Sequence, residues 1–324
     1  MNDRSTSSPL TLSIAAVERD TRLSKDTLRV WERRYGFPTP LRDGAGERAY
    51  TLEQVEKLRV VKRLLDVGHR PGRIVPLPLD QLQHLAEQTV DQPQRGVEAA
   101  LGSVELRAQL ELIRSHDLPA LRNELQRLLV RHGVHRFITD VLGPLSVAVG
   151  DAWIRGQMEI FEEHAYSEAV QSVLRGALAA IPPSDRDDAP RVLLTTLPGE
   201  QHGLGLLMVE ALLAMDGCRC VSLGVQTPVW DIALAARAYR SDIVALSFTA
   251  CVSPNQVIDS LTELRAKLPP QVSLWAGGSA PALQRRAIPD VLALHGLDDM
   301  AAALMRWRQG RPGPAGNLDL ACLK

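Results

Sequence analysis

The sequence predicts a multidomain protein that combines helical regions with one α/β domain built on a doubly wound parallel sheet. Three observations support this fold class. Two short helices across a tight turn are predicted near the N-terminus, longer helices follow from residue 104, and strands alternate with helices from residue 192. The chain of 324 residues is long enough for two or three domains with a sizeable core.

The composition is that of an ordinary globular protein, with 45% hydrophobic and 23% charged residues. No apolar stretch approaches the roughly 20 residues of a membrane span, and the polar N-terminus lacks the apolar core of a signal peptide. We therefore expect a cytoplasmic protein with no membrane partner. Its four cysteines lack CxxC spacing, so we expect reduced thiols rather than a disulfide or a zinc site.

The formal net charge of −1 conceals a basic N-terminal region. Up to Val75 the sequence has 15 Lys and Arg against 10 Asp and Glu, a local charge of +5. The rest of the chain is correspondingly acidic. A basic region on an otherwise acidic protein favours a nucleic-acid partner for that region.

The N-terminal region is predicted to be a helix-turn-helix with a wing. Apolar spacing after Ser13 predicts a short helix, and Ser24 can cap a second helix over 25–34. The segment 41–50 is rich in Gly, Arg and Asp, which suits a small β-hairpin. A capping box that begins at Thr51 then opens a further helix.

About residues 10 to 75 resemble the winged helix-turn-helix domain of MerR-family transcription regulators, on the matching segments Thr27–Gly36 and Arg48–Thr51. The resemblance implies that basic residues of the second helix and the wing contact double-stranded promoter DNA. The expected DNA-binding residues are Lys25, Arg29, Arg33, Arg34, Arg42 and Arg48. A solvated helix surface is the alternative for any single arginine. One such head binds a short site, so we expect a homo-oligomer, a dimer or tetramer.

Strands and helices alternate after a polar joint at 182–188, which predicts a doubly wound, flavodoxin-like parallel sheet. Ligands of such sheets bind beyond the carboxyl ends of the strands. Several residues follow predicted strands and are candidate contacts at this edge. They are Glu200, His202, Gly205, Ser222, Gly224, Gly277 and Gly278.

His202 is the candidate metal ligand of this edge. Its imidazole can ligate a metal through one ring nitrogen, while the Glu200 carboxylate holds the other nitrogen and sets the tautomer. One protein histidine cannot bind a bare transition metal tightly. The pair therefore favours a metal that arrives in its own macrocycle, a corrinoid, over the alternative of a surface histidine at a strand–helix junction.

The pattern Glu200-x-His202-x-x-Gly205, followed by Ser222-x-Gly224 and Gly277-Gly278, resembles the cobalamin-binding fold of corrinoid methyltransferases, mutases and related regulators. The resemblance implies that His202 replaces the cofactor's own lower base on cobalt, with Glu200 in place of the more usual Asp. It also implies a slot for the released nucleotide tail, lined by Ser222, Gly277 and Gly278.

The helices over 104–181 are predicted to form a bundle of about four helices that covers the upper face of the cofactor. The pattern formed by Trp153 and Glu163-His164, with nine residues between them, resembles the bundle motif of CarH/LitR-type light-dependent repressors. The resemblance implies that Trp153 packs on the upper ligand and that Glu163 and His164 contact an adenosyl group. A core tryptophan and a solvated Glu-His pair are the alternatives.

Ile154 departs from this family pattern. In CarH-type proteins a histidine follows the tryptophan and takes the upper cobalt position after light breaks the cobalt–carbon bond, and isoleucine cannot ligate. His164, His132, His135 or water are the substitutes that we consider. The expected cofactor is adenosylcobalamin, with methylcobalamin or another chromophore as alternatives.

The sequence thus predicts a cobalamin-dependent, light-responsive transcriptional repressor that is not an enzyme. The alternatives are a light-blind cobalamin-sensing regulator and, from another class, a corrinoid methyl-carrier protein. The predicted boundaries are 1–88 for the MerR-type head, 89–103 for a linker, 104–185 for the four-helix bundle, 186–308 for the cobalamin-binding domain and 309–324 for a disordered tail.

Overall fold

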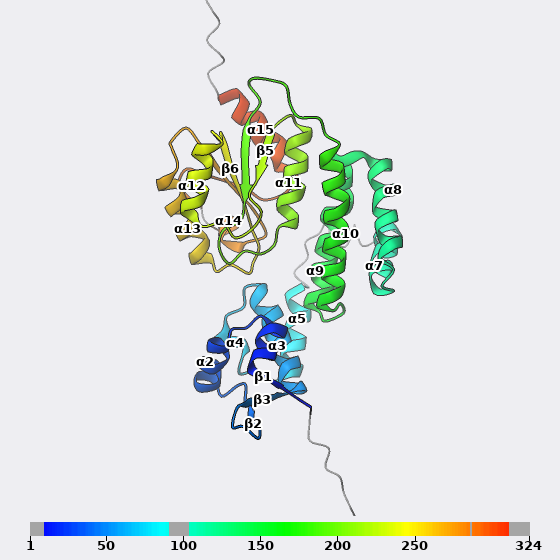
Figure 1. Cartoon of the computed structure of the whole chain (residues 1–324), viewed down its shortest axis with the longest axis vertical. Coiled ribbons are helices and arrows are strands. Elements are labelled where there is room, and N and C mark those ends of the chain that lie inside the picture. The colour runs from blue at the N-terminus through cyan, green and yellow to red at the C-terminus, as the bar shows by residue number, and fades with distance from the viewer. Residues whose placement is uncertain (1–9, 91–103, 286, 311–324) are drawn as a thin grey trace, which may run out of the picture. The chain divides into compact units, whose positions relative to one another are not determined.

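The computed structural model describes residues 10–90, 104–285 and 287–310 (Figure 1). Most of the linker expected over 89–103 and of the tail expected over 309–324 lies outside these residues. The chain divides into two compact units. The first takes the described residues up to Leu128, Asp140–Val170 and Ala250–Ser253, and the second takes Leu129–Thr139, Gln171–Thr249 and the described residues from Pro254 onwards.

The N-terminal part of the first unit, here called the head, is a winged helix-turn-helix. Its elements are β1 (Thr11–Ser13), α1 (Ile14–Thr21), α2 (Lys25–Tyr35), β2 (Leu41–Arg42), β3 (Arg48–Thr51), α3 (Leu52–Asp66), α4 (Pro71–Ile74) and α5 (Leu79–Val90). The three strands form a small antiparallel sheet in the order β1-β3-β2. Buried apolar side chains of α1, α2 and α3, such as Val17, Leu28 and Leu64, form one core beneath them.

Local signals in the sequence fix the ends of the head's helices, as predicted. The Ser24 hydroxyl accepts a hydrogen bond from the Thr27 amide at 3.1 Å and caps α2. The same helix ends at Gly36, whose φ of +69° is a left-handed conformation that glycine adopts at little cost. Thr51 caps α3. The sequence does not predict β1, because three residues are too few to show a strand period.

Helices follow in the middle of the chain, as the sequence predicts. They are α7 (Val104–Arg114), α8 (Leu118–Arg136), the π-helical turn η1 (Phe137–Leu142), α9 (Gly143–Ile154) and α10 (Ile160–Ala179). Gly133, with a φ of 72° and a ψ of 163°, kinks α8. In the first unit the hydroxyls of Ser146 on α9 and Tyr166 on α10 share a hydrogen bond of 2.7 Å.

One helical run in the described residues, Leu118–Ile154, is long and apolar enough to cross a membrane by length and composition alone. Its most apolar 18-residue stretch has a mean hydropathy of 1.3 and is 44% buried. The expectation that the chain has no membrane partner stays a prediction. One such run is weak evidence for a span, because core helices of globular proteins have the same composition.

The second unit contains a parallel sheet of five strands in the order β5-β4-β6-β7-β8. Its elements are β4 (Arg191–Thr195), α11 (Leu204–Met215), β5 (Arg219–Ser222), α12 (Val229–Ala238), β6 (Ile243–Phe248), α13 (Pro254–Lys267), β7 (Ser273–Gly278), α14 (Pro281–Arg285), β8 (Val291–Leu294) and α15 (Asp299–Gly310). Helices α11 and α15 cover one face of the sheet, and α12 and α13 cover the other (Figure 1). The predicted doubly wound fold is confirmed.

The described cysteines form no disulfide with one another. Cys218 is buried, and Cys220 and Cys251 are half-buried. Burial raises the pKa of Cys218 to about 12 and that of Cys220 further, so both thiols stay protonated and unreactive at neutral pH.

A substitution at Gly278, the last residue of β7, tests the packing of this sheet. Its φ is +109°, and a Cβ there would stand 2.1 Å from the backbone oxygen of Phe248. We expect Gly278→Ala to lower the free energy of unfolding by at least about 2 kcal/mol. Urea unfolding of the full-length protein, followed by circular dichroism, measures the change.

The matched control is Gly176→Ala in α10, where a Cβ would meet no atom within 4 Å. This control is expected to stabilise its helix by up to about 1 kcal/mol. Equal stability of the two variants would contradict the close contact between β6 and β7.

Candidate functional site

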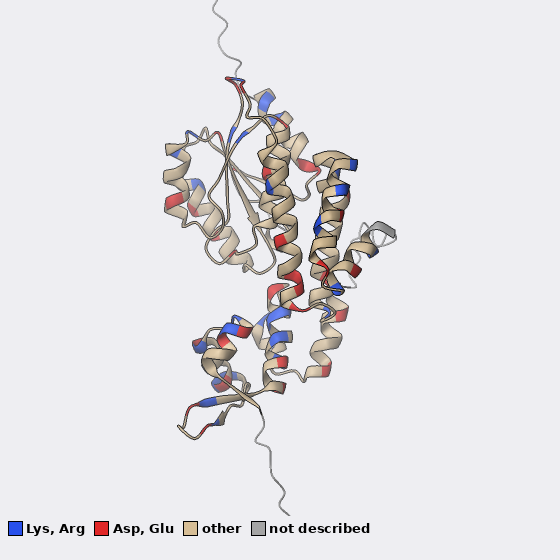
Figure 2. Cartoon of the chain, turned by 45° about the vertical axis from the view of Figure 1, so that its right-hand side comes forward, with Lys and Arg blue, Asp and Glu red and all other residues tan. Residues whose placement is uncertain are grey.

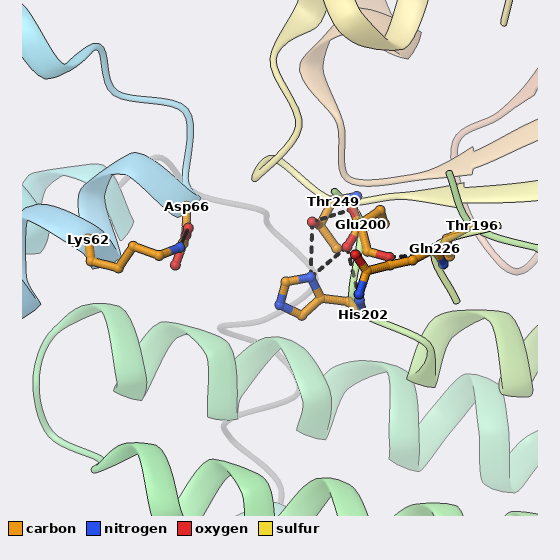
Figure 3. Close-up of polar contacts among 7 residues, drawn as sticks. All are labelled: Lys62, Asp66, Thr196, Glu200, His202, Gln226 and Thr249. Atoms are coloured by element: carbon orange, nitrogen blue, oxygen red, sulfur yellow. Dashed lines mark hydrogen bonds and ion pairs between the residues drawn. The ribbon is translucent and has the colours of Figure 1, made fainter. Parts of the chain in front are cut away.

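His202 lies beyond the carboxyl end of β4, where the chain changes direction across the sheet. The next two strands, β5 and β6, flank β4 on opposite sides. Such a switch point is where open α/β sheets form their ligand crevice. The loop from β4 to α11 carries Glu200 and His202, and the end of β6 brings Thr249 to them (Figure 3).

The Glu200 carboxylate holds the imidazole of His202 in one orientation. Its Oε1 atom accepts hydrogen bonds from His202 Nδ1 at 2.6 Å and from the His202 amide at 3.0 Å. Its Oε2 atom accepts from the amide and the hydroxyl of Thr249 at 2.6 and 2.7 Å. A proton on Nδ1 leaves the ring's lone pair on Nε2, the nitrogen that can ligate a metal.

Glu200 is fully buried, whereas 55% of the His202 side chain is exposed. Burial alone would raise the pKa of Glu200, but the hydrogen bonds from His202 and Thr249 outweigh it and hold the pKa below its ordinary value. The carboxyl group is therefore charged at neutral pH. A charged acceptor binds the Nδ1 proton more strongly than a neutral one would.

The backbone of the β4–α11 loop is fixed by a second threonine. The Thr196 hydroxyl donates to the Glu200 carbonyl at 2.7 Å and accepts from the Gln226 amide at 2.8 Å (Figure 3). This bridge joins the loop after β4 to the loop after β5. The position of Glu200 is thus set by both its backbone and its side chain.

A narrow cavity of about 160 Å³ runs beside this loop, across the carboxyl ends of β6, β7 and β8. Gly205 and Gly277, which carry no side chain, leave room in it, and Gly278 lines it as well. Ser247 contributes a hydroxyl, and the remaining wall includes Trp275. The wall is therefore mostly apolar, and glycines form part of it.

Ser222 and Gly224 do not line this cavity, which corrects the expectation for Ser222. Ser222 is the last residue of β5 and Gly224 follows that strand, and β5 is separated from β6 by β4 in the sheet order. The serine in the cavity is Ser247 of β6 instead. Sequence reasoning missed Ser247 and Thr249, although both stand at the end of a predicted strand, where ligand contacts are expected.

Trp153, Glu163 and His164 lie in the first unit, around the turn between α9 and α10. Glu163 accepts hydrogen bonds from His164 Nδ1 at 2.6 Å and from the Ser167 hydroxyl at 2.7 Å. Trp153 is half-buried near the end of α9. The imidazole of His164 is therefore oriented by a carboxylate, as that of His202 is.

Basic residues recur along the helices and hairpin of the head (Figure 2). Arg33 is exposed on α2, and Arg42 donates to the carbonyl of Gly46 at 2.9 Å in the hairpin. Arg48 differs from them, because its guanidinium pairs with Glu32 of α2 at 2.8 Å. Arg48 therefore joins the wing to α2. The other expected contacts have local partners: Lys25 pairs with Glu18, Arg29 with Asp26, and Arg34 lies over the Tyr35 ring.

No group of three or more His, Cys, Asp or Glu side chains in the described part of the chain could hold a metal ion. Glu200 and His202 alone offer one ligating nitrogen. This donor set suits a metal that brings its other ligands with it.

Comparison with known proteins shows which families the N-terminal head, the helices after it and the α/β domain are similar to. Residues 12–77 match the MerR HTH family of regulatory proteins, and residues 106–175 and 190–302 each match a B12-binding domain family. The chain is 34% identical over 271 residues to the HTH-type transcriptional repressor CarH of Myxococcus xanthus, covering 83% of this chain and 89% of that protein. It is 30% identical over 262 residues to the repressor CarA of the same organism, covering 80% and 84%.

The fold and the site define a DNA-binding regulator with cobalamin-binding domains. The chain belongs to the family of the MerR-type transcriptional repressors CarH and CarA. The corrinoid protein for monomethylamine of Methanosarcina barkeri has the same fold over 61% of this chain and 96% of that protein, with a TM-score of 0.51 and 17% identity. This last likeness concerns the fold alone.

The lowered pKa of Glu200 makes a testable contribution to stability. Because the pKa in the folded protein lies below the ordinary value of 4.5, the carboxylate stabilises the fold above pH 4.5 and loses this effect as the pH falls through the folded pKa. We expect Glu200→Gln to lower the free energy of unfolding by about 2 kcal/mol at pH 7. The loss should shrink as the pH falls below 4.5.

Urea unfolding at a series of pH values measures this difference. Glu168→Gln, at an exposed position of α10, serves as the control and should change stability little at any pH. A loss for Glu200→Gln that stays constant down to pH 3.5, about one unit below the ordinary pKa, would contradict the assignment of a charged, hydrogen-bonded Glu200.

Proposed function

We propose that the chain is a light-responsive repressor in which the state of a bound cobalamin controls oligomerisation and DNA binding. One observation carries the proposal. A MerR-type head and a B12-binding domain occur in one chain, and the Glu200–His202 pair stands at the switch point of that domain. We assign His202 as the lower axial ligand of cobalt and Glu200 as the residue that orients it.

The residues of the second unit fit a corrinoid. His202 offers one oriented nitrogen, which is enough for a metal already held in a macrocycle. The cavity lined by Gly205, Gly277 and Gly278 lies at the same edge of the sheet, and we assign it to the nucleotide tail. Because Ser247 lines this cavity, we assign the contact with that tail to Ser247 rather than to Ser222. Gly224 has no assigned contact.

We assign Trp153, Glu163 and His164 to the upper ligand. An indole provides a flat apolar cover, and a carboxylate accepts protons from ribose hydroxyl or adenine amino groups. These groups suit adenosylcobalamin better than methylcobalamin, whose methyl ligand has no polar group to recognise. An alkylcobalamin supplies a cobalt–carbon bond that light breaks. Ile154 has no ligating atom, so it cannot occupy the upper position afterwards.

DNA binding is assigned to the head, through Lys25, Arg29, Arg33, Arg34 and Arg42, with Arg48 holding the wing against α2. A head of this size needs a second copy to read paired half-sites, so we propose a dimer or tetramer. The proposed domains are 1–88 for the head, 104–185 for the bundle and 186–308 for the cofactor domain, with 89–103 as a linker and 309–324 as a tail.

Loss of the lower ligand gives the first test of this proposal. We expect His202→Ala to retain at most about a tenth as much adenosylcobalamin as the wild type after gel filtration. Loss of a residue that only hydrogen-bonds to a metal ligand already lowers metal affinity about 10- to 100-fold. Gln201→Ala, at the exposed neighbouring residue, should retain the wild-type amount. Absorbance of the cofactor per mole of protein measures retention. Unchanged retention in His202→Ala would reject ligation by this residue.

Illumination gives the second test. We expect the full-length protein with adenosylcobalamin to bind promoter DNA as an oligomer in the dark. Green light should then lower the mass of the assembly and release the DNA. The intact cofactor favours one assembly over another by a few kcal/mol, and breakage of its cobalt–carbon bond removes this preference. Gel filtration with light scattering and a DNA mobility shift, before and after illumination, measure both effects.

A light-blind regulator that reports cobalamin supply is the second candidate, and Ile154 is the observation that favours it. Photolysis of the cofactor without any change in mass or in DNA binding would contradict light control and support this candidate. Dependence of DNA binding on cobalamin alone is its expected behaviour.

A further inference from the structure

In the first unit, the turn between α9 and α10 packs against the head. Ile154, the last residue of α9, is half-buried against the hydrophobic core that the head's own helices form. That core includes Leu58, Val61 and Leu64 of α3. Ile154 thus has an apolar partner in the head, which gives a structural reason for an apolar side chain at this position.

Arg63 of α3 makes a second set of contacts with the same turn. Its guanidinium lies over the Trp153 ring, 5.9 Å from the centroid, within the range of a cation–π interaction. A Cβ at Gly156 would stand 2.8 Å from Arg63 Nη1, so glycine leaves space for the guanidinium. Burial lowers the pKa of Arg63, and the charge of Glu159 acts in the opposite direction. Glu159 thus attracts the buried cation.

Arg22 provides the third contact. Its Nη2 atom donates to His164 Nε2 at 2.8 Å, while His164 Nδ1 donates to Glu163 at 2.6 Å. Arg22 caps α1 with a left-handed φ of 56°, and its amide donates to the Glu18 carbonyl. The arginine is therefore held at the turn of the helix-turn-helix, from which its side chain reaches α10.

We propose that the surface formed by Trp153, Ile154 and His164 is a docking site for the DNA-binding head, and that the head and the cofactor's upper ligand compete for it. This inference rests on the proposed function, which assigns Trp153, Glu163 and His164 to an adenosyl group. His164 cannot accept from Arg22 and serve an adenosyl group through the same Nε2 atom. The indole face of Trp153 beneath Arg63 can likewise be covered by only one partner at a time.

Competition has a thermodynamic consequence that can be measured. A ligand that binds only the undocked protein has an apparent affinity equal to its intrinsic affinity multiplied by the undocked fraction. By linkage, binding of that ligand weakens the docking of the head by the same factor. Docking leaves Arg33 on α2 exposed, so it restricts the orientation of the head rather than access to α2. Release would let two heads of an oligomer take the spacing of paired half-sites.

The first experiment measures cobalamin affinity by absorbance titration in the dark. Arg22→Ala removes the contact with His164 from the head's side, and Arg19→Ala, at an exposed position of α1, removes the same charge as a control. We expect Arg22→Ala to bind adenosylcobalamin about fivefold more tightly and methylcobalamin with unchanged affinity, because a methyl ligand does not need His164. Arg19→Ala should match the wild type for both.

The second experiment begins with the cobalamin-free protein and measures docking of the head directly. Hydrogen–deuterium exchange of the cobalamin-free protein follows peptides from the end of α1 and from α3. Ile154→Ser should increase exchange in both, because it weakens docking from the bundle's side. The control is Val130→Ser, an equivalent change at a side chain that is 86% exposed on α8, and it should leave exchange unchanged. Adenosylcobalamin added to the wild type should produce the same increase as Ile154→Ser.

Three results would overturn the inference. They are unchanged adenosylcobalamin affinity in Arg22→Ala, equal tightening for methylcobalamin, and unchanged exchange in Ile154→Ser. Failure of the proposed function looks different. A wild type that binds neither cobalamin contradicts both that function and the competition, while increased exchange in Ile154→Ser would still establish docking of the head.

Discussion

The buried carboxylate of Glu200 is the interaction on which the cofactor site depends. It is fully buried, yet both of its oxygens are saturated by donors from His202 and Thr249. A buried charge without such partners would cost several kcal/mol. The same four hydrogen bonds join the loop after β4 to the end of β6 and fix the ring of His202. Stability and ligand orientation therefore have one common cause at this site.

The same chemical pair occurs again in the bundle with a different role. Glu163 orients His164 through Nδ1, as Glu200 orients His202. In the cofactor domain, the oriented nitrogen suits a metal, whereas in the bundle it accepts from Arg22 of the head. An imidazole with one nitrogen fixed presents a single acceptor atom, and such an atom serves one partner at a time. In the competition that we propose, this chemistry links cofactor recognition to the position of the head.

Much of the fold follows from local sequence signals, while several contacts of the site do not. Apolar strand runs located β4 to β8, and caps such as Ser24 and Gly36 located α2, because these signals lie within a few residues of the elements they define. Ser247, which lines the cavity, was not predicted as a contact, because strand order is decided by packing between distant segments and does not show in the local sequence. The pairing of Arg48 with Glu32 and the contact of Ile154 with the head also join residues far apart in the chain.

The most direct test of the central claim examines the bond between His202 and cobalt. Electron paramagnetic resonance of cob(II)alamin bound to the full-length protein resolves the splitting caused by the nitrogen on the lower face of cobalt. Protein prepared with histidine labelled with nitrogen-15 should show the splitting pattern of the labelled isotope, since the ligand is an imidazole of the chain. Retention of the unlabelled pattern would show that the cofactor keeps its own base, and it would contradict the role of His202.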